Sequence, residues 1–392
     1  MFLRTITLST AVPADLASEF ASRIYFVSDD ITDFELIAED DEVVAVRLEM
    51  SADIPEEKLA EDLERLIELD VLSQRNPTEK TVWESGNPEN VRQHIFADML
   101  SRGMAKTVGE GQIALGSPFL ELMDALDARL RNLVRDAGGS ERRYPTLIGI
   151  QTLQRCGYFA SFPQFVMFVT RLHTDLNGYR EFADHAAQAE RLGPELVERF
   201  ANADYCLPPT MCYHTFHELD GTAVPESGCV ISTRGKSFRH EARYHRTLER
   251  LWDFTIREVV FLGERTFVQA QRQWFIDRIL ALIEELDLSG RLVVANDPFF
   301  CSARTGERIW SQRLLELKYE LRLDIESGRD LAAGSFNLHE TFFGDTFGIT
   351  RPEGDTVHTG CLGIGLERLA YAFVCRHGLD PARWPDSLAL PS

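Results

Sequence analysis

The sequence predicts an α+β protein in which a small α+β module precedes a larger block built on an antiparallel sheet flanked by helices. The strand-like runs beyond residue 200 are joined by irregular loops, without the strand–helix alternation that a parallel sheet requires. Acidic residues are concentrated before residue 70, which sets that segment apart from the rest. A chain of 392 residues is also long enough to bury two cores.

The N-terminal module, residues 1–85, is acidic and mixes strand and helix patterns. Residues 1–70 contain 19 Asp and Glu against 5 Lys and Arg, a balance of −14 within a total of −21. An acidic module repels phosphate backbones, so we do not expect it to bind nucleic acid. Apolar, β-branched runs predict strands at 2–10 and 34–50. Helical spacing of apolar residues predicts helices at 13–24 and 54–70.

The larger block, residues 90–392, follows the stretch "SQRNPTEKTVWESGNPEN" (73–90), whose composition predicts a loop and linker. The run "FLELMDALDARLRNLVRDAGG" (119–139) predicts a helix that ends at its glycines. Further helices are expected at 267–286 and in "LERLAYAFVCRHG". The predicted strands are "GCVIST", "FTIREVVFLG", "RLVVAN" and "ELRLDIES".

Composition excludes several classes of protein. No apolar run approaches the ~20 residues of a membrane span, and "MFLRTITLST" lacks the apolar core of a signal peptide. The seven cysteines are odd in number and scattered, which argues against a disulfide framework. We therefore expect a protein of the reducing cytoplasm.

Two glycines near the C-terminus look at first like a dinucleotide-binding fingerprint. In "CLGIGLERLAYAF" (361–373) Gly363 and Gly365 have the right spacing, but Arg368 stands where a third glycine is needed. The fingerprint also needs a parallel βαβ unit, which the pattern does not predict. Taken alone, such glycines indicate packing or a turn.

A second unusual stretch is locally basic within an acidic protein. Residues 234–257 contain seven Lys and Arg against three acids, a balance of +4 between two predicted strand ends. Such a loop is a candidate anion site. Composition alone does not decide between that site and a solvated hairpin with surface charge.

Together these stretches resemble class II aminoacyl-tRNA synthetases. Segment 238–258 is similar to the second motif of that family, with F-R-x-E, a basic loop and a return strand, and 363–368 is similar to its third motif. The resemblance implies the class II synthetase catalytic fold, an antiparallel sheet flanked by helices. It also implies that Gly363 and Gly365 let the backbone approach ATP closely.

The resemblance gives each remaining residue of the two motifs a role. Arg239 would hold the α-phosphate and the substrate carboxylate, and Arg368 would lie along the triphosphate, where a planar guanidinium suits phosphoryl oxygens. Phe254 would stack on adenine. Glu241 would sit beside the adenine amino group or the loop.

The resemblance narrows to the atypical, archaeal-type seryl-tRNA synthetases and their truncated relatives, the amino acid:[carrier protein] ligases. Cys212, Glu258 and Cys361 look like the zinc site of both groups, and the similarity covers roughly residues 115–385. Stretches that look like the ligases specifically are "LQRCGYFASFPQF" (153–165), "DPFF" (297–300), "LKYEL" (317–321), "GSFNLHETFFG" (334–344) and "HGLDPARWP" (377–385).

The chemistry of the three residues suits a working zinc ion. Two thiolates and one carboxylate leave a tetrahedral zinc with an open position, which the α-amine of an amino acid can take. The three residues are 46 and 103 positions apart, so three separate segments must converge. Without the resemblance, a lone cysteine is more often a core residue.

Other site residues follow only from the resemblance. Asn337 and His339 lie in the segment that lines the amino acid and ATP pocket of the family. ATP and Mg²⁺ are expected as cofactors beside Zn²⁺. Synthetases carry a Mg²⁺-binding glutamate near that segment, where this chain has Ala332 and Ala333, so the ligands of Mg²⁺ stay open.

Two acceptors are compatible with an aminoacyl-adenylate made from an amino acid and ATP. A seryl-tRNA synthetase needs a tRNA-binding arm, and the short, acidic N-terminal module disfavours tRNA. We therefore expect transfer to the phosphopantetheine thiol of a small carrier protein. A catalytically inactive paralogue is disfavoured because the motif residues are all present.

We expect a homodimer built on "RRYPTLIGI" (142–150), a degenerate first motif. Docking of an acidic carrier protein needs a basic face, for which Arg180, Arg191 and Arg199 are candidates. The resemblance implies a small amino acid such as glycine or alanine, but the sequence does not predict which one, nor the role of the N-terminal module.

Overall fold

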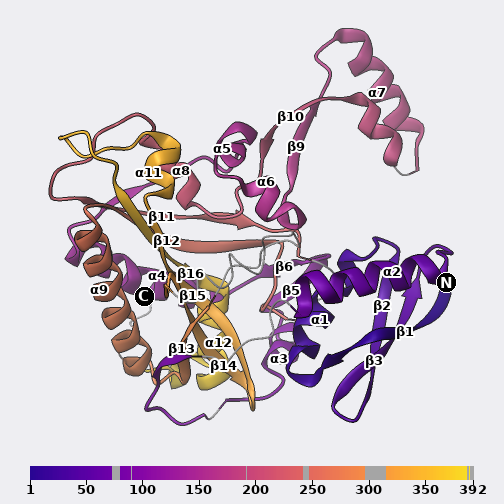
Figure 1. Ribbon diagram of the computed structural model, residues 1–392, viewed down its shortest axis with the longest axis horizontal. Coiled ribbons are helices and arrows are strands. Elements are labelled where there is room, and N and C mark those ends of the chain that lie inside the picture. The colour runs from indigo at the N-terminus through magenta and orange to yellow at the C-terminus, as the bar shows by residue number, and fades with distance from the viewer. Residues whose placement is uncertain are drawn as a thin grey trace.

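A computed structural model describes residues 1–72, 80–89, 91–190, 192–241, 247–295, 315–385 and 388. Within these residues the chain forms a small N-terminal module, a large mixed layer of sheet and helices, and an arm that projects from it (Figure 1). No described helix has the length and apolar character that crossing a membrane requires. "DPFF" (297–300) and Arg191 lie outside the described residues.

The N-terminal module is a three-stranded antiparallel sheet, in the order β1-β3-β2, covered by two helices. The predicted strand 34–50 is in fact a hairpin, because Asp40 and Asp41 both take left-handed backbone angles that aspartate tolerates. The elements are β1 (Phe2–Pro13), α1 (Ala17–Arg23), β2 (Ile31–Glu39), β3 (Glu42–Met50) and α2 (Glu56–Leu66), with one-turn 3₁₀ helices at Ala14–Leu16 and Ile24–Phe26 and a π-helical turn at Ile67–Val71.

The large sheet has eight strands in the order β4-β13-β14-β15-β16-β12-β11-β7, and all neighbours are antiparallel except β7 and β11. This architecture confirms the predicted α+β class. Residues 81–84, predicted as loop, form β4 at one edge. The strands are β4 (Thr81–Glu84), β7 (Ser140–Arg142), β11 (Cys229–Phe238), β12 (Asp253–Gly263), β13 (Gly290–Val294), β14 (Lys318–Glu326), β15 (Arg329–Glu340) and β16 (His358–Gly365).

Helices cover both faces of this sheet. On one face α4 (Phe119–Asp136), α9 (Arg265–Glu285) and α12 (Leu366–His377) enclose the main hydrophobic core. The other face carries a second, smaller core in which Cys212 and Cys361 are buried. Its helices are α5 (Ile150–Arg155), α6 (Tyr158–Ser161), α8 (Cys212–Glu218) and α11 (Phe342–Phe347).

Two smaller units complete the described chain. A hairpin of β5 (Ala105–Gly109) and β6 (Gln112–Leu115) follows α3 (Ile95–Ser101). The arm projects beyond the body and carries α7 (Leu176–Gln188) at its far end, with no buried residue on that helix (Figure 1). The arm strands are β8 (Ile148–Gly149), β9 (Phe168–Leu172) and β10 (Phe200–Cys206), and the remaining 3₁₀ turns are Pro163–Phe165, Pro194–Arg199 and Pro381–Arg383.

Candidate active site

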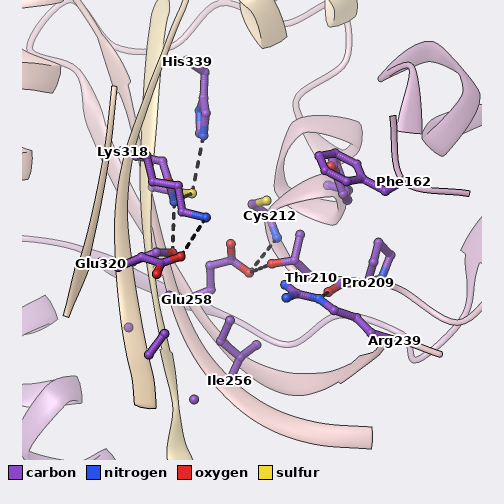
Figure 2. Close-up of a pocket in the computed structure, with 18 of the residues that line it drawn as sticks. Phe162, Pro209, Thr210, Cys212, Arg239, Ile256, Glu258, Lys318, Glu320 and His339 are labelled. Carbon is purple, nitrogen blue, oxygen red and sulfur yellow. Dashed lines mark hydrogen bonds and ion pairs between the residues drawn. The ribbon is translucent and has the colours of Figure 1, made fainter. Parts of the chain in front are cut away.

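A pocket of about 270 Å³ opens on the face of the large sheet that carries the second core (Figure 2). Side chains alternate along strands, so Phe254, Ile256 and Glu258 of β12 all point into it. Strand register builds its floor, because Gly363 of β16 pairs with Glu258 on one side and Ser335 on the other. With no side chain at 363, the Ile256 side chain packs directly over the backbone there.

Cys212, Glu258 and Cys361 meet at one end of this pocket. Each offers one ligand atom, and these atoms lie within 4.8 Å of one another, with all three residues buried. Cys212 begins α8, Glu258 lies on β12 and Cys361 lies on β16. The three separate segments therefore converge, as the zinc prediction requires.

The carboxylate of Glu258 is oriented by three donors. Its Oε2 accepts hydrogen bonds from Thr210 Oγ1 (2.7 Å), the Met211 amide (2.7 Å) and the Cys212 amide (3.0 Å). Burial, with the nearby Cys361 sulfur, nevertheless raises the pKa of Glu258 to about 7. A buried carboxylate between two sulfurs is costly without a cation, and this donor set of two sulfurs and one oxygen fits zinc.

Asn337 and His339, predicted to bind the amino acid, line the pocket and contact the Cys361 sulfur. Asn337 Nδ2 lies 3.5 Å and His339 Nε2 lies 3.6 Å from Sγ, and His339 Nδ1 lies 3.2 Å from Thr359 Oγ1. A hydrogen bond from Cys212 lowers the pKa of the Cys361 thiol, which favours the thiolate that binds metals. The two side chains therefore fix the position of a sulfur that is a candidate metal ligand.

The other end of the pocket is cationic. Arg239 Nε donates to the Pro209 carbonyl (3.1 Å), and its guanidinium carbon lies 5.4 Å from the centre of the Phe254 ring. Arg368 is half-buried, and its Nη1 donates to the Ala332 carbonyl (2.9 Å). Burial, together with neighbouring arginines, lowers the pKa of Arg368 to about 10. Guanidinium groups held this close without full pairing attract an anion.

The carboxylate of Glu241 faces the cationic end from the basic loop. Its Oε2 lies 2.9 Å from Arg250 Nη1, an arginine that the sequence had shown only as part of a basic stretch. Residues 242–246, the middle of that loop with Arg243 and Arg246, lie outside the described residues. Arg250 is thus a third described guanidinium near Arg239 and Arg368.

Glu367 ties the third motif to the second. This buried carboxylate accepts from the Thr255 amide (2.8 Å to Oε2) and from Thr255 Oγ1 (2.8 Å to Oε1). Thr255 follows Phe254, and Arg368 follows Glu367. The two hydrogen bonds therefore fix the Phe254 ring and the Arg368 guanidinium relative to each other. Motif matching alone does not show this contact.

Lys318 and Glu320 also line the pocket, although the sequence assigned them no role. Both lie on β14 and point to the same face, and Lys318 Nζ is 3.2 Å from Glu320 Oε1 (Figure 2). In register, Glu320 stands beside Ser335. Ala332 and Ala333 line the same region, so Glu320 is the carboxylate that faces the pocket there. The alternation K-x-E within a strand was the available signal.

No protein-family model matches the chain. Over 301 residues it is 34% identical to amino acid–[acyl-carrier-protein] ligase 2 of Bradyrhizobium diazoefficiens, which covers 76% of this chain and 86% of that protein. Ligase 1 of the same organism is 32% identical over 293 residues, covering 74% and 86%. The type-2 serine–tRNA ligase of Methanopyrus kandleri is 27% identical over 331 residues, covering 79% of this chain and 62% of that protein.

Solved structures show the same fold. The SerRS of M. kandleri, in a complex with A. aeolicus tRNASec, superposes with a TM-score of 0.71 at 23% identity, over 98% of this chain and 76% of that one. A serine-tRNA ligase from Naegleria fowleri, in complex with AMP, gives 0.61 at 14% identity over 85% and 76%. The likeness confirms the predicted class II synthetase fold. With two relatives above 30% identity over most of their length, the chain belongs to the family of amino acid–[acyl-carrier-protein] ligases.

Proposed function

We propose that this protein is an ATP-dependent ligase that activates an amino acid and transfers it to a carrier protein. One observation carries the proposal: a single pocket has a buried thiol and carboxylate cluster at one end and guanidinium groups at the other. An amino acid and ATP need both kinds of group in one pocket, because the amine binds a metal and the phosphates bind cations.

At the first end, Cys212, Glu258 and Cys361 are the residues that would hold Zn²⁺. When bound, zinc would supply an open Lewis-acid position for the α-amine of the substrate. Asn337 and His339 keep Cys361 in place, and Thr210 keeps Glu258 in place. A hydroxy acid would lack the amine, so this end selects amino acids.

At the second end, the chain's own side chains bind ATP and align the reacting atoms. Arg239 holds the α-phosphate and the amino acid carboxylate, whose oxygen attacks phosphorus and expels pyrophosphate. Phe254 stacks on adenine, and Arg368 binds the triphosphate. A β-carbon at position 363 would lie 2.8 Å from Ile256 Cδ1, which accounts for Gly363 in the floor.

The magnesium ion that accompanies ATP needs oxygen ligands. Glu320 and Ser335, which face each other across β14 and β15, are the residues that we propose for this role in place of Ala332 and Ala333. Mg²⁺ keeps several waters and phosphate oxygens as ligands, so one carboxylate and one hydroxyl fit it. The ion would offset negative charge between the phosphates.

The second half of the reaction forms a thioester and releases AMP. The phosphopantetheine thiol loses its proton, attacks the carbonyl carbon of the adenylate and displaces AMP. For docking of the carrier we favour α7, whose residues Leu176, Tyr179 and Arg180 are exposed on the projecting arm. Arg180 is the one arginine of this helix and stands beside Glu181 and Asp184, so α7 is not in itself a basic face. Arg199 lies 3.9 Å from Glu181, so it is already partly paired.

The decisive experiment combines enzyme, ATP and a labelled amino acid with holo-carrier protein, apo-carrier protein or total tRNA. Label should appear on the holo-carrier alone and be released by hydroxylamine, as a thioester is. Label on tRNA, or on the carrier without phosphopantetheine, would contradict the proposal. The predicted homodimer, built on 142–150, is tested by sedimentation of the same preparation.

A further inference from the structure

Trp252 joins the hairpin β5–β6 to the proposed ATP-binding loop. Trp252 lies just after the basic loop, and its amide donates to the carbonyl of Gly111 at the hairpin tip (2.9 Å). A β-carbon built on Gly111 would lie 2.2 Å from Trp252 Cδ1, so the indole rests directly on the glycine. Only a residue without a side chain allows this contact.

Trp252 is bonded in turn to both predicted ATP-binding residues of the loop. Its indole Nε1 donates to the Glu241 carbonyl (2.7 Å), and its own carbonyl accepts from the Arg239 amide (2.9 Å). The Glu241 amide donates to the Arg239 carbonyl (2.8 Å), and the His240 ring lies 4.8 Å from the Trp252 ring. At the base of the loop, Arg239, Glu241 and Trp252 are therefore joined by a closed ring of three hydrogen bonds.

We propose that Trp252 is a positioning residue for ATP and that the hairpin tip at Gly111 supports it. The hairpin fixes the indole, and the indole fixes the backbone from which Arg239 and Glu241 reach the nucleotide. The inference rests on the proposed function, in which these two residues bind ATP. It adds a part of the molecule, residues 105–115, that neither synthetase motif includes.

The first test removes one hydrogen bond from Trp252. Trp252→Phe keeps an apolar ring and loses the indole N–H, so the dissociation constant of a non-hydrolysable ATP analogue should rise about fivefold. The zinc content should stay at the wild-type value, because Cys212, Glu258 and Cys361 do not touch this ring. Calorimetry with the analogue and elemental analysis measure the two quantities.

The second test compares Gly111, at the hairpin tip, with Gly103, which precedes the first strand of the hairpin. Gly111 (φ +61°) and Gly103 (φ +70°) both have left-handed backbone angles, but a β-carbon on Gly103 meets nothing within 4 Å. Gly111→Ala and Gly103→Ala should therefore lose similar thermal stability from backbone strain. Only Gly111→Ala displaces Trp252, and its affinity for the analogue should fall at least about tenfold, while Gly103→Ala stays within about twofold.

The double variant Gly111→Ala, Trp252→Phe separates this mechanism from two independent defects. Its ATP affinity should be no worse than that of Gly111→Ala alone, because both changes act through the same ring. Wild-type affinity in Trp252→Phe, or equal losses in Gly111→Ala and Gly103→Ala, would overturn the inference. A wild-type protein that fails to bind the analogue would instead overturn the proposed function.

Discussion

The two ends of the pocket are built in different ways. Cys212, Glu258 and Cys361 are all buried residues, and strand register places two of them. The cationic end depends on Arg239 and Arg250, which flank a loop, and on Arg368 at the start of α12. One end is fixed by the sheet, whereas the other is assembled from loop and helix.

This difference indicates how the substrates are ordered along the pocket. A rigid cluster suits a metal, because a metal site needs fixed ligand distances. Guanidinium groups on a loop suit a flexible triphosphate, since each can follow a phosphate oxygen. Changes at the two ends should therefore affect different substrates, and the predictions below test that separation.

The largest effect is expected from Cys361→Ser, at the end of the pocket that contains Cys212, Glu258 and Cys361. Loss of one of two sulfur ligands should remove the zinc, and amino-acid-dependent ATP–pyrophosphate exchange should fall at least about 100-fold. Binding of the ATP analogue should stay near the wild-type value, because the guanidinium end is intact. Elemental analysis, which should give about one zinc per wild-type chain, and calorimetry measure the two outcomes.

Chelation of the wild-type protein is the matched control for Cys361→Ser, since it removes the metal and leaves every side chain in place. Activity should return when zinc is added back to the chelated wild type and not to the variant. Exchange at the wild-type rate in a zinc-free Cys361→Ser protein would refute the metal assignment and with it the comparison of the two ends.

Arg368→Lys should impair the use of ATP and leave the zinc in place, which is the reverse of the result expected for Cys361→Ser. An ammonium keeps the charge and loses the planar fork, so kcat/KM for ATP should fall by about 100-fold. Zinc content should be unchanged. Arg383→Lys serves as the control, because Arg383 is exposed and does not line the pocket. Loss of zinc in Arg368→Lys would show that the two ends are not separate.

A smaller effect is expected from Glu367→Gln. The amide can still accept from Thr255, but it lacks the charge that strengthens both hydrogen bonds. The positions of Phe254 and Arg368 relative to each other should be less well fixed, and the KM for ATP should rise about threefold. The KM for the amino acid should not change. A variant in which both constants rise together would indicate general loosening of the sheet.

The strands that sequence patterns predicted are those with continuous apolar, β-branched runs, such as β11 and β12. Strands β15 and β16 carry glycines that weaken the pattern. A β-carbon on Gly360 would lie 2.3 Å from Phe261 Cε2, and one on Gly334 would lie 2.3 Å from Ile364 Cδ1. The glycines that this close packing requires are therefore also the residues that made β15 and β16 hard to recognise in the sequence.

Site residues could be predicted from the sequence only where a family motif names them and the strand register brings them to the pocket. Two cysteines and a glutamate far apart in sequence gave no spacing that indicates a metal, and only family resemblance connected them. Glu320 went unassigned because the role that we propose for it depends on which strand lies beside β14. Trp252 was missed because its partner, Gly111, lies 141 positions earlier in the chain.

The smallest expected effect concerns pH and lies outside both ends of the pocket. His377 ends the helix that begins beside Arg368, and its Nε2 lies 2.9 Å from the Leu286 carbonyl. Burial lowers the pKa of His377 below its ordinary value of 6.5. The folded protein thus favours neutral histidine, and the unfolded chain takes up a proton first as the pH falls. Stability from His377 is present above pH 6.5 and is lost on acidification.

His377→Gln removes this titration and keeps a group that can donate to the Leu286 carbonyl. The fall in Tm between pH 7.5 and pH 5 should be smaller than in the wild type by about 1–2 °C. His173→Gln, at an exposed histidine, should show the wild-type fall. Because His377 lies away from the pocket, zinc content and ATP affinity at pH 7.5 should match the wild type in both variants. A fall in Tm that is unchanged in His377→Gln would show that other groups carry the acid sensitivity of α12, and a change in ATP affinity would show that the helix transmits strain to Arg368.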